Sequence, residues 1–392
     1  DTESNWRTTH FDYHSFEDNL FKLDVLGHDD PTMIRYLMDY VKEHPIDFPF
    51  SDATEIPLDD PNVYKLLNGT EVIGLKKEDI NSDIASFGIP EMGTSFVRDM
   101  LRDSRPQNFA DAVKISGLSH GTDVWLNNAK TLVNGSNPRF GKIPFKNVIG
   151  CRDDIMVSLI HWGMKEAVAF EISEFIRRGK AAGNPSKWET YKQIMRSHKI
   201  PEWYIWSCGQ IKYMFPKAHA TAYVMMAMRI AWFKVYKPIV FYSAYFSKRA
   251  SDFDVYAMQG GEYTIAKKMQ EIGEKGNKAT ETEKRQFTVL EICNEMVKRG
   301  FKFRPIDINK SDARDFIIAE DGLSLYLPFI TIDGLGLKVA NSIVEARSDE
   351  EFKSKSDIKE RTSISKSLFT KLEMLDVFDG LPDDSQMNLF DM

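Results

Sequence analysis

Lys212-Tyr-Met-Phe-Pro-Lys-Ala-His-Ala-Thr-Ala-Tyr223 runs directly into Val224-Met-Met-Ala-Met-Arg-Ile-Ala-Trp-Phe-Lys234. The second half of this stretch has apolar residues on nearly every side of a helix, which predicts a helix buried in a core. Its first half offers Lys217, His219 and Tyr223 from the first turn, where free backbone N–H groups favour an anion. The stretch therefore predicts a core helix whose first turn faces a ligand.

The segment between Trp203 and Ser251 contains no Asp or Glu, although the whole chain carries a formal net charge of -7. Cations beside aromatic rings suit a nucleotide or nucleic acid, because the charge neutralises phosphate while a ring covers a base. The alternative is that the segment is mostly core helix, and both interpretations can hold at once. The cations of this acid-free segment are Lys212, Lys217, Arg229, Lys234, Lys237, Lys248 and Arg249.

The composition indicates a folded protein with several domains. Its 392 residues, of which 42% are apolar, suffice for two or three hydrophobic cores. Cys151, Cys208 and Cys293 are far apart and form no CxxC pair, which argues against a zinc cage or a disulfide framework and fits a reducing cytoplasm. No apolar run approaches the ~20 residues that span a bilayer, so we expect no membrane partner.

The predicted fold class is mainly α with minor β structure (α+β). Residues 1–29 are predicted to be β structure, with 19–27 as a short buried strand that ends at a glycine. Acidic residues then open a helix at Asp29, and helices predominate to about residue 300. Short strand-like runs beyond residue 300 precede another helical unit, which predicts a domain boundary there.

Asp24 lies inside the predicted strand, where an unpaired carboxylate is costly unless a cation compensates it. Mg²⁺ is a suitable cation, because it binds a few carboxylates together with substrate phosphate oxygens. One carboxylate is too few for a two-metal site, and Asp24 could instead cap the following turn. Asp252-Phe-Asp254 has the spacing of a metal pair, but no strand pattern surrounds it, and we interpret it as a structural loop.

Two further segments could face a ligand. Gly117-Leu-Ser-His-Gly-Thr-Asp-Val-Trp125 predicts a polar turn punctuated by glycine, and a plain turn between helices explains it equally well. Arg152 precedes an apolar helix, where an Arg can clamp a triphosphate or simply pair with Asp153 and Asp154.

Near the C-terminus, Gly334 and Gly336 flank an apolar residue between a short apolar run and an amphipathic helix, the pattern of a helix-hairpin-helix. The glycine turn of that motif brings backbone N–H groups close to a DNA phosphate, and Lys338 could add a contact. A tight turn without a ligand is the alternative. Beyond it, Gln386-Met-Asn-Leu-Phe390 forms a polar tail with an apolar pair, which favours a protein partner.

Four motifs together closely resemble the PolC-type replicative DNA polymerase, the Gram-positive form of the catalytic α subunit of bacterial DNA polymerase III. The resemblance covers essentially all of the chain, in order. It implies the end of a palm domain in 1–40, fingers in 41–300, a helix-hairpin-helix DNA-binding domain in 301–380 and a sliding-clamp-binding tail in 381–392. The motifs are Phe21-Lys-Leu-Asp-Val-Leu-Gly-His-Asp-Asp-Pro-Thr32, Leu118-Ser-His-Gly-Thr-Asp-Val-Trp125, Gly150-Cys-Arg-Asp-Asp-Ile-Met156 and Tyr213-Met-Phe-Pro-Lys-Ala-His-Ala-Thr-Ala-Tyr223.

The resemblance also implies roles for single residues. Asp24 matches the third catalytic aspartate and would bind Mg²⁺, in a two-metal addition of dNTPs to the primer 3′-OH of primer-template DNA. Gln386, Leu389 and Phe390 match the anchors of the clamp-binding pattern. The residues implied around the incoming nucleotide are Arg152, Lys217, His219, Tyr223, Phe215, Ser119, His120 and Lys22.

The family's first two catalytic aspartates would lie before residue 1, so we expect this segment alone to be inactive. The implied partners are primer-template DNA, dNTPs, the sliding clamp (β subunit) and other replisome subunits, in the cytoplasm. The rival interpretation is a non-catalytic DNA-binding and clamp-tethering module. It explains residues 300–392 equally well, but it does not explain Asp24 or the grouping of Lys217, His219 and Tyr223 with Arg152.

Overall fold

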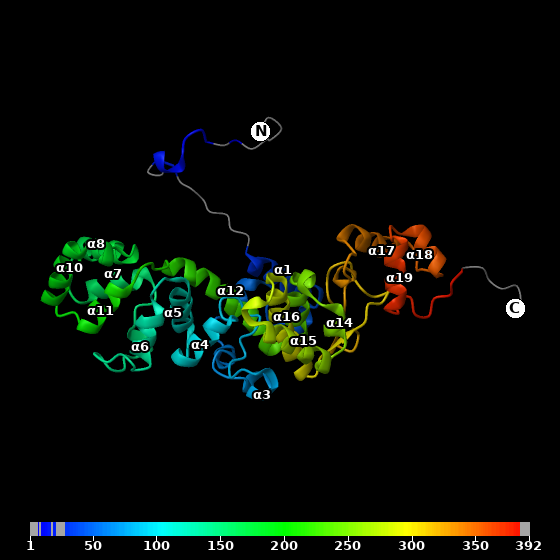
Figure 1. Ribbon diagram of the computed structural model, residues 1–392, viewed down its shortest axis with the longest axis horizontal. Coiled ribbons are helices and arrows are strands. Elements are labelled where there is room, and N and C mark those ends of the chain that lie inside the picture. The colour runs from blue at the N-terminus through cyan, green and yellow to red at the C-terminus, as the bar shows by residue number, and fades with distance from the viewer. Residues whose placement is uncertain (1–6, 8, 17–18, 21–27, 385–392) are drawn as a thin grey trace, which may run out of the picture.

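The computed structural model describes residues 7, 9–16, 19–20 and 28–384. Figure 1 shows an elongated arrangement, with α7, α8, α10 and α11 at one end, α12 in the middle and α17 to α19 at the other end. The first helices are α1 (Asp29–Glu43), α2 (Pro61–Leu66), α3 (Lys77–Ile80), α4 (Ser95–Ser104), α5 (Phe109–His120), α6 (Lys130–Val133), α7 (Arg152–His161), α8 (Glu166–Arg177), α9 (Lys180–Gly183) and α10 (Pro185–Ser197). They are followed by α11 (Glu202–Gln210), α12 (Lys217–Tyr236), α13 (Pro238–Lys248), α14 (Val255–Gln259), α15 (Glu262–Lys275), α16 (Glu281–Lys298), α17 (Leu337–Asp349), α18 (Lys355–Arg361) and α19 (Lys366–Met374).

Single helical turns connect several of these helices. The 3-10 turns are η1 (Tyr13–Ser15), η2 (Pro45–Asp47), η3 (Ala53–Glu55), η4 (Glu71–Ile73), η6 (Phe145–Asn147), η7 (Ala250–Asp252), η8 (Gly276–Lys278) and η9 (Phe329–Thr331), and η5 (Trp125–Ala129) is a π-helical turn.

The central helix α12 begins at Lys217, directly after Pro216, as the sequence predicts. Val224, Ile230 and Phe233 are fully buried, and the helix packs against α1, α2, α5, α7 and α13. Because neighbours cover α12 on several sides, its apolar residues are not confined to one face. The later turns of α12 are buried in the core, whereas its first turn lies at the surface.

A buried ion pair joins α12 to α16. Lys234 Nζ lies 2.8 Å from Glu295 Oε2, and neither side chain is exposed to solvent. The same ammonium donates to the carbonyls of Ala85 and Phe87, and the Tyr242 hydroxyl on α13 donates to Glu295. These bonds attach the loop 85–93, which lies between α3 and α4, to three helices of the core.

A small sheet follows α16, as the strand-like runs beyond residue 300 predict. Its strands are β1 (Lys302–Arg304), β2 (Ile317–Ile318) and β3 (Ser324–Tyr326), in the order β1-β3-β2. β1 pairs with β3 in parallel, and β2 pairs with β3 in the antiparallel sense, with Leu325 opposite both Phe303 and Ile318. The sheet packs against α13, and α17, α18 and α19 come after it in the chain. The mainly helical fold class with minor β structure is confirmed.

Two local predictions were wrong. In the described part of residues 1–29 the structure has the 3-10 turn η1 in place of β structure. No described strand pairs with this part of the chain, and a β-strand needs such a partner for its backbone hydrogen bonds. Residues 21–27 of the predicted strand lie outside the described residues. The turn predicted at 117–125 is shorter than expected: α5 continues to His120, and the non-helical turn occupies 121–124. Gly117 lies inside α5, where a Cβ would lie 2.5 Å from Gly150 O.

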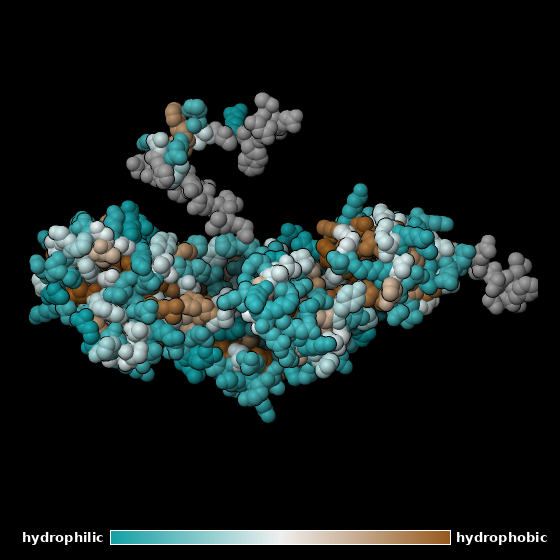
Figure 2. Space-filling model, viewed as in Figure 1, coloured by the Kyte–Doolittle hydropathy of each residue, from teal (hydrophilic) through white to brown (hydrophobic). Residues whose placement is uncertain are grey.

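The Asp252-Phe-Asp254 loop is structural, as interpreted from its sequence. Asp252 pairs with Arg285, and the Asp254 side chain accepts the backbone N–H of Ala257 at the start of α14. In the view of Figure 2 the surface is mostly hydrophilic. No helix in the described part of the chain is long and apolar enough to cross a membrane.

Candidate nucleotide-binding site

Three segments that are far apart in the sequence meet at the start of α12. The backbone N–H of Thr122, just after α5, donates to Tyr213 O at 2.9 Å, and that of Lys212 donates to Thr122 O at 3.1 Å. The N–H of Arg152, at the start of α7, donates to Phe215 O at 3.1 Å. Backbone hydrogen bonds thus fix the end of α5 and the start of α7 against the segment that leads into α12.

A continuous row of five rings lies across this junction. Centroid distances are 4.9 Å from His120 to Phe215, 4.5 Å from Phe215 to His219, 4.4 Å from His219 to Tyr223 and 4.5 Å from Tyr223 to His28. His120 and His28 are exposed, and the other three rings are partly exposed. This ring row comes from α5, the segment before α12, the first two turns of α12 and the residue before α1. It offers ring faces and edges on which a base can stack.

The electrostatic environment of the row favours neutral side chains at its centre. Burial lowers the pKa of the His219 imidazole, and the neighbouring His120 and His28 lower it further against the opposing effect of Glu91. Burial, Asp30 and Glu91 raise the pKa of the Tyr223 phenol. At neutral pH His219 is therefore a hydrogen-bonding group, not a fixed cation.

Two cations, Lys217 at the start of α12 and Arg152 at the start of α7, belong to the same junction as the row. Lys217 Nζ lies 3.0 Å from Asp154 Oδ1, and its backbone N–H donates to Asp153 Oδ2 at 2.8 Å. Arg152 Nε lies 3.7 Å from the same Asp153 oxygen, so the pairing that the sequence left open is present. Burial opposes the charge of Lys217, but the hydrogen bond and charge of Asp154 outweigh burial and raise its pKa. A phosphate would have to replace or share these carboxylate contacts.

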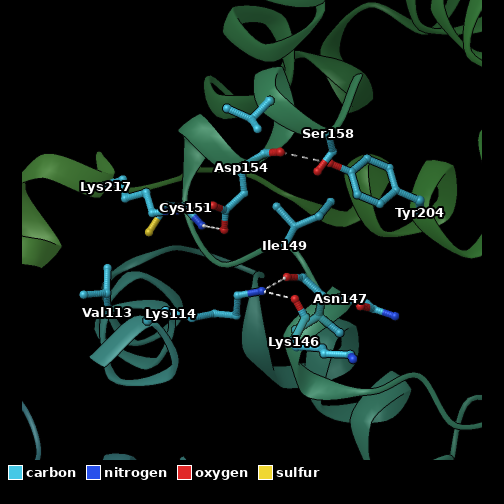
Figure 3. A pocket seen from close by; sticks show the side chains of 13 residues that line it. Val113, Lys114, Lys146, Asn147, Ile149, Cys151, Asp154, Ser158, Tyr204 and Lys217 are labelled. Atoms are coloured by element: carbon cyan, nitrogen blue, oxygen red, sulfur yellow. Dashed lines mark hydrogen bonds and ion pairs between the residues drawn. The ribbon is translucent and has the colours of Figure 1, made fainter. Parts of the chain in front are cut away.

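A cavity of about 280 Å³ lies beneath Lys217, between α5, α7 and the segment 146–151. Figure 3 shows Lys114 reaching toward this segment, where its Nζ donates to the carbonyls of Lys146 and Val148 at 2.6 and 2.9 Å. Burial lowers the pKa of Lys114. Burial also raises the pKa of the Cys151 thiol to about 12, which keeps it protonated and argues against a nucleophilic role.

Ser119 points back toward its own helix. Its Oγ donates to Ser116 O at 2.9 Å and lies 3.0 Å from His120 Nδ1. Ser119 therefore supports the orientation of His120, whereas the sequence predicts that it lines the pocket.

The predicted helix-hairpin-helix turn is at the surface, ahead of α17. Gly334 has a φ of +85°, a left-handed conformation that favours glycine, whereas Gly336 is extended and precedes the first helical residue. Leu335 between them is buried and anchors the turn, while Lys338 is exposed. Lys371 of α19 donates to the Asp333 carbonyl and closes the turn from the other side. No side chain caps α17, so its first N–H groups are available to an anion.

Comparison with known proteins identifies the chain. A model of the bacterial DNA polymerase III alpha subunit finger domain matches residues 30–199, and a model of the helix-hairpin-helix motif matches residues 300–387. The "DNA polymerase III PolC-type" of Lacticaseibacillus paracasei is 49% identical over 391 residues, and that of Oceanobacillus iheyensis is 50% identical over 390 residues. The chain belongs to the PolC-type DNA polymerase III family. It covers 26% of the length of either relative, which in turn matches 100% of this chain.

Several predicted site residues of this PolC-type chain lie outside the described residues. They are Lys22 and Asp24 before α1, and Gln386, Leu389 and Phe390 after α19. Within the described residues no group of three or more His, Cys, Asp and Glu side chains could hold a metal ion. The Mg²⁺ site and the clamp-binding tail stay predictions.

The structure adds residues to the PolC-type site that sequence reasoning missed. Glu91, in the loop 85–93, contacts His120, and Lys114 on α5 lines the same cavity as Lys217; neither residue lies in a motif that suggests chemistry. Asp153 and Asp154 were expected only as local partners of Arg152, but both reach across to Lys217. No local pattern in the sequence could have shown these contacts.

Proposed function

We propose that this PolC-type segment forms the nucleotide-binding wall and part of the DNA-binding surface of a replicative DNA-directed DNA polymerase. That enzyme would add dNTPs to a primer 3′-OH in a template-directed reaction. One observation carries the proposal: the ring row and the cations Lys217 and Arg152 belong to the same junction, which is built from three separate segments. Rings suit a base, and adjacent cations suit its phosphates.

The residues of this chain would bind and orient the nucleotide. Lys217 and Arg152 would neutralise phosphate charge, exchanging contacts with Asp153 and Asp154 for contacts with phosphate oxygens. His219, with its lowered pKa, would offer a neutral hydrogen-bonding ring. Phe215 and Tyr223 would pack against the base or sugar.

A catalytic Mg²⁺ site would require more carboxylate ligands than this segment supplies. Mg²⁺ would supply Lewis-acid chemistry at the primer hydroxyl and the triphosphate. Asp24 would contribute one carboxylate, and a two-metal site needs several. We therefore propose that the segment alone does not extend a primer.

The remaining domains would hold DNA and the replisome. Residues 1–40 would end the palm, 41–300 would form the fingers, and Gly334, Gly336 and Lys338 in 301–380 would contact the DNA backbone without reading its sequence. Gln386, Leu389 and Phe390 in the tail would bind the sliding clamp, and further replisome subunits would join through the longer polymerase.

Photocrosslinking tests the nucleotide site. A photoreactive dNTP is added, with primer-template DNA, to a PolC-type polymerase that carries this segment, and the labelled peptides are mapped. We expect label within residues 203–251 and less label in Lys217→Gln. Lys212→Gln is a matched control, because Lys212 is an exposed lysine of the same segment that pairs with Asp123 and not with Asp153 or Asp154. Label confined to other regions would sink the assignment.

A second test addresses catalysis. Asp24→Ala in the same polymerase should abolish extension while primer-template binding is largely kept, and substantial remaining extension would contradict its role. The alternative of a DNA-binding and clamp-tethering module is supported by the exposed turn around Gly334. That module would bind DNA and clamp but would take no label from the photoreactive dNTP.

A further inference from the structure

The loop 85–93 brings a carboxylate, Glu91, to one end of the ring row. Glu91 Oε2 lies 3.3 Å from His120 Nε2 and accepts a hydrogen bond from Ser116 Oγ at 3.1 Å. The Glu91 side chain is 14% exposed, whereas His120 is 38% exposed. A largely buried acid thus holds the edge of a ring whose face is open to solvent.

The opposite edge of the same ring is also held. His120 Nδ1 lies 2.8 Å from Ser116 O, and because this carbonyl and the Glu91 carboxylate can only accept, the ring makes both hydrogen bonds in its doubly protonated form. With both nitrogens engaged, the imidazole has one orientation, in which it stacks on Phe215 at an interplanar angle of 25°. Phe215 in turn contacts His219 on α12. The contact of Glu91 therefore sets the position of the first two rings of the row.

Glu91, whose side chain contacts His120, has a strained backbone. Its φ is +64°, a left-handed conformation that is unfavourable for a residue with a Cβ and better suited to glycine or asparagine. Hydrogen bonds hold the loop on both sides: Lys234 binds the carbonyls of Ala85 and Phe87, and Arg98 binds that of Gly93. Strain that the surroundings enforce next to a ligand site points to a function for the side chain.

We infer that Glu91 is a positioning residue for the nucleotide, acting through His120 and Phe215. It holds the imidazole stacked on the Phe215 ring, so that both rings are already in position when the nucleotide arrives. This inference rests on the proposed function. Glu91 also lines a cavity of about 690 Å³, together with His28 and Asp30.

The decisive variant is Glu91→Asn in the PolC-type polymerase that carries this segment. Asparagine fits the left-handed backbone better than glutamate, but its shorter side chain leaves His120 without this partner. We expect KM for dNTP to rise about five- to tenfold, as for loss of one charge-assisted hydrogen bond, with a smaller change in kcat. Thermal stability should stay the same or increase. Lys199→Asn is the matched control, because Lys199 has a φ of +58° and is exposed away from the row.

A double-mutant cycle with His120→Ala separates positioning from a structural role. If Glu91 acts through His120, Glu91→Asn has no further effect on KM once His120 is alanine. The inference is overturned if Glu91→Asn leaves KM unchanged, if it raises KM equally in both backgrounds, or if His120→Ala itself has no effect. In each of these cases the photocrosslinking experiment decides on the proposed function separately. Label from the photoreactive dNTP within residues 203–251 would leave the proposed function in place, whereas no label there would contradict the proposed function too.

Discussion

Replacing Lys234 by Met leaves the carboxylate of Glu295 buried without its cation. Both side chains have 0% exposure, and Nζ contacts three acceptors at 2.6 to 2.8 Å: Glu295 and the carbonyls of Ala85 and Phe87. An ammonium has three protons, so it is fully satisfied. Burial lowers the pKa of Lys234 to about 8, which still leaves it protonated at neutral pH. Met has a similar length but donates to none of the three acceptors.

The expected loss in free energy of unfolding for Lys234→Met is about 3–5 kcal/mol, because an unpaired charge remains buried. Replacing both partners, Lys234→Met with Glu295→Met, should cost much less than the sum of the single changes, since no charge then stays in the core. The Tyr242 hydroxyl, which donates to Glu295, still contacts Arg299 in the double variant.

The assay is urea unfolding of this chain at neutral pH, followed by far-ultraviolet circular dichroism. Lys284→Met is the matched control, because Lys284 pairs with Glu281 at the surface, where both side chains are at least half exposed. That control should change the free energy of unfolding by less than about 1 kcal/mol. The reasoning is refuted if Lys234→Met costs no more than this control, or if the double variant is as unstable as the sum of the two single ones.

Three further predictions concern single positions. Burial lowers the pKa of His219 below its ordinary value of 6.5. Just below pH 6.5 the unfolded chain therefore binds more protons than the folded one, and stability is lost as the pH falls. His219→Gln should reduce that loss in thermal melts at stepped pH, and an unchanged dependence of the melting temperature on pH would contradict the argument. Gly117→Ala should lower the free energy of unfolding in urea by about 1–3 kcal/mol, because its Cβ would lie 2.5 Å from Gly150 O. Gly273→Ala, at a helical position with open space around it, should not lower the free energy of unfolding at all. Thr280→Ala should lower the free energy of unfolding by about 1 kcal/mol, since the Thr280 hydroxyl accepts a hydrogen bond from the Glu283 N–H in the first turn of α16. Thr280→Ser should keep most of that stability, and equal losses in the two variants would exclude the cap as the cause.

Elements with strong local signals were predicted correctly. The apolar residues of 223–234 predicted the buried helix α12, and the acidic residues at Asp29 predicted the start of α1. The glycine pair at 334–336 and the four motifs indicated the helix-hairpin-helix and the PolC-type family, both confirmed by comparison with known proteins. These signals succeed because caps, turns and apolar periodicity act between residues a few positions apart.

Elements that depend on distant partners were not predictable in the same way. Gly117 suggested a turn, but it lies inside α5, where the lack of a Cβ serves the contact with Gly150. Glu91 and Lys114 lie in no motif, yet Glu91 contacts His120 and Lys114 lines the same cavity as Lys217. The roles of Asp24 and of the clamp-binding tail stay predictions, because these residues lie outside the described part of the chain.

The amino-acid sequence was enough to predict the family, the mainly helical class and a ligand-facing role for the acid-free stretch 203–251. The folded chain showed how that stretch is arranged: His120, Phe215, His219 and Tyr223 form one row, and Asp153 and Asp154 contact the cations Lys217 and Arg152. The difference lies in the range of the interactions. Capping and periodicity are set by neighbours in the chain, whereas ring contacts, ion pairs and burial arise between segments that only folding brings together.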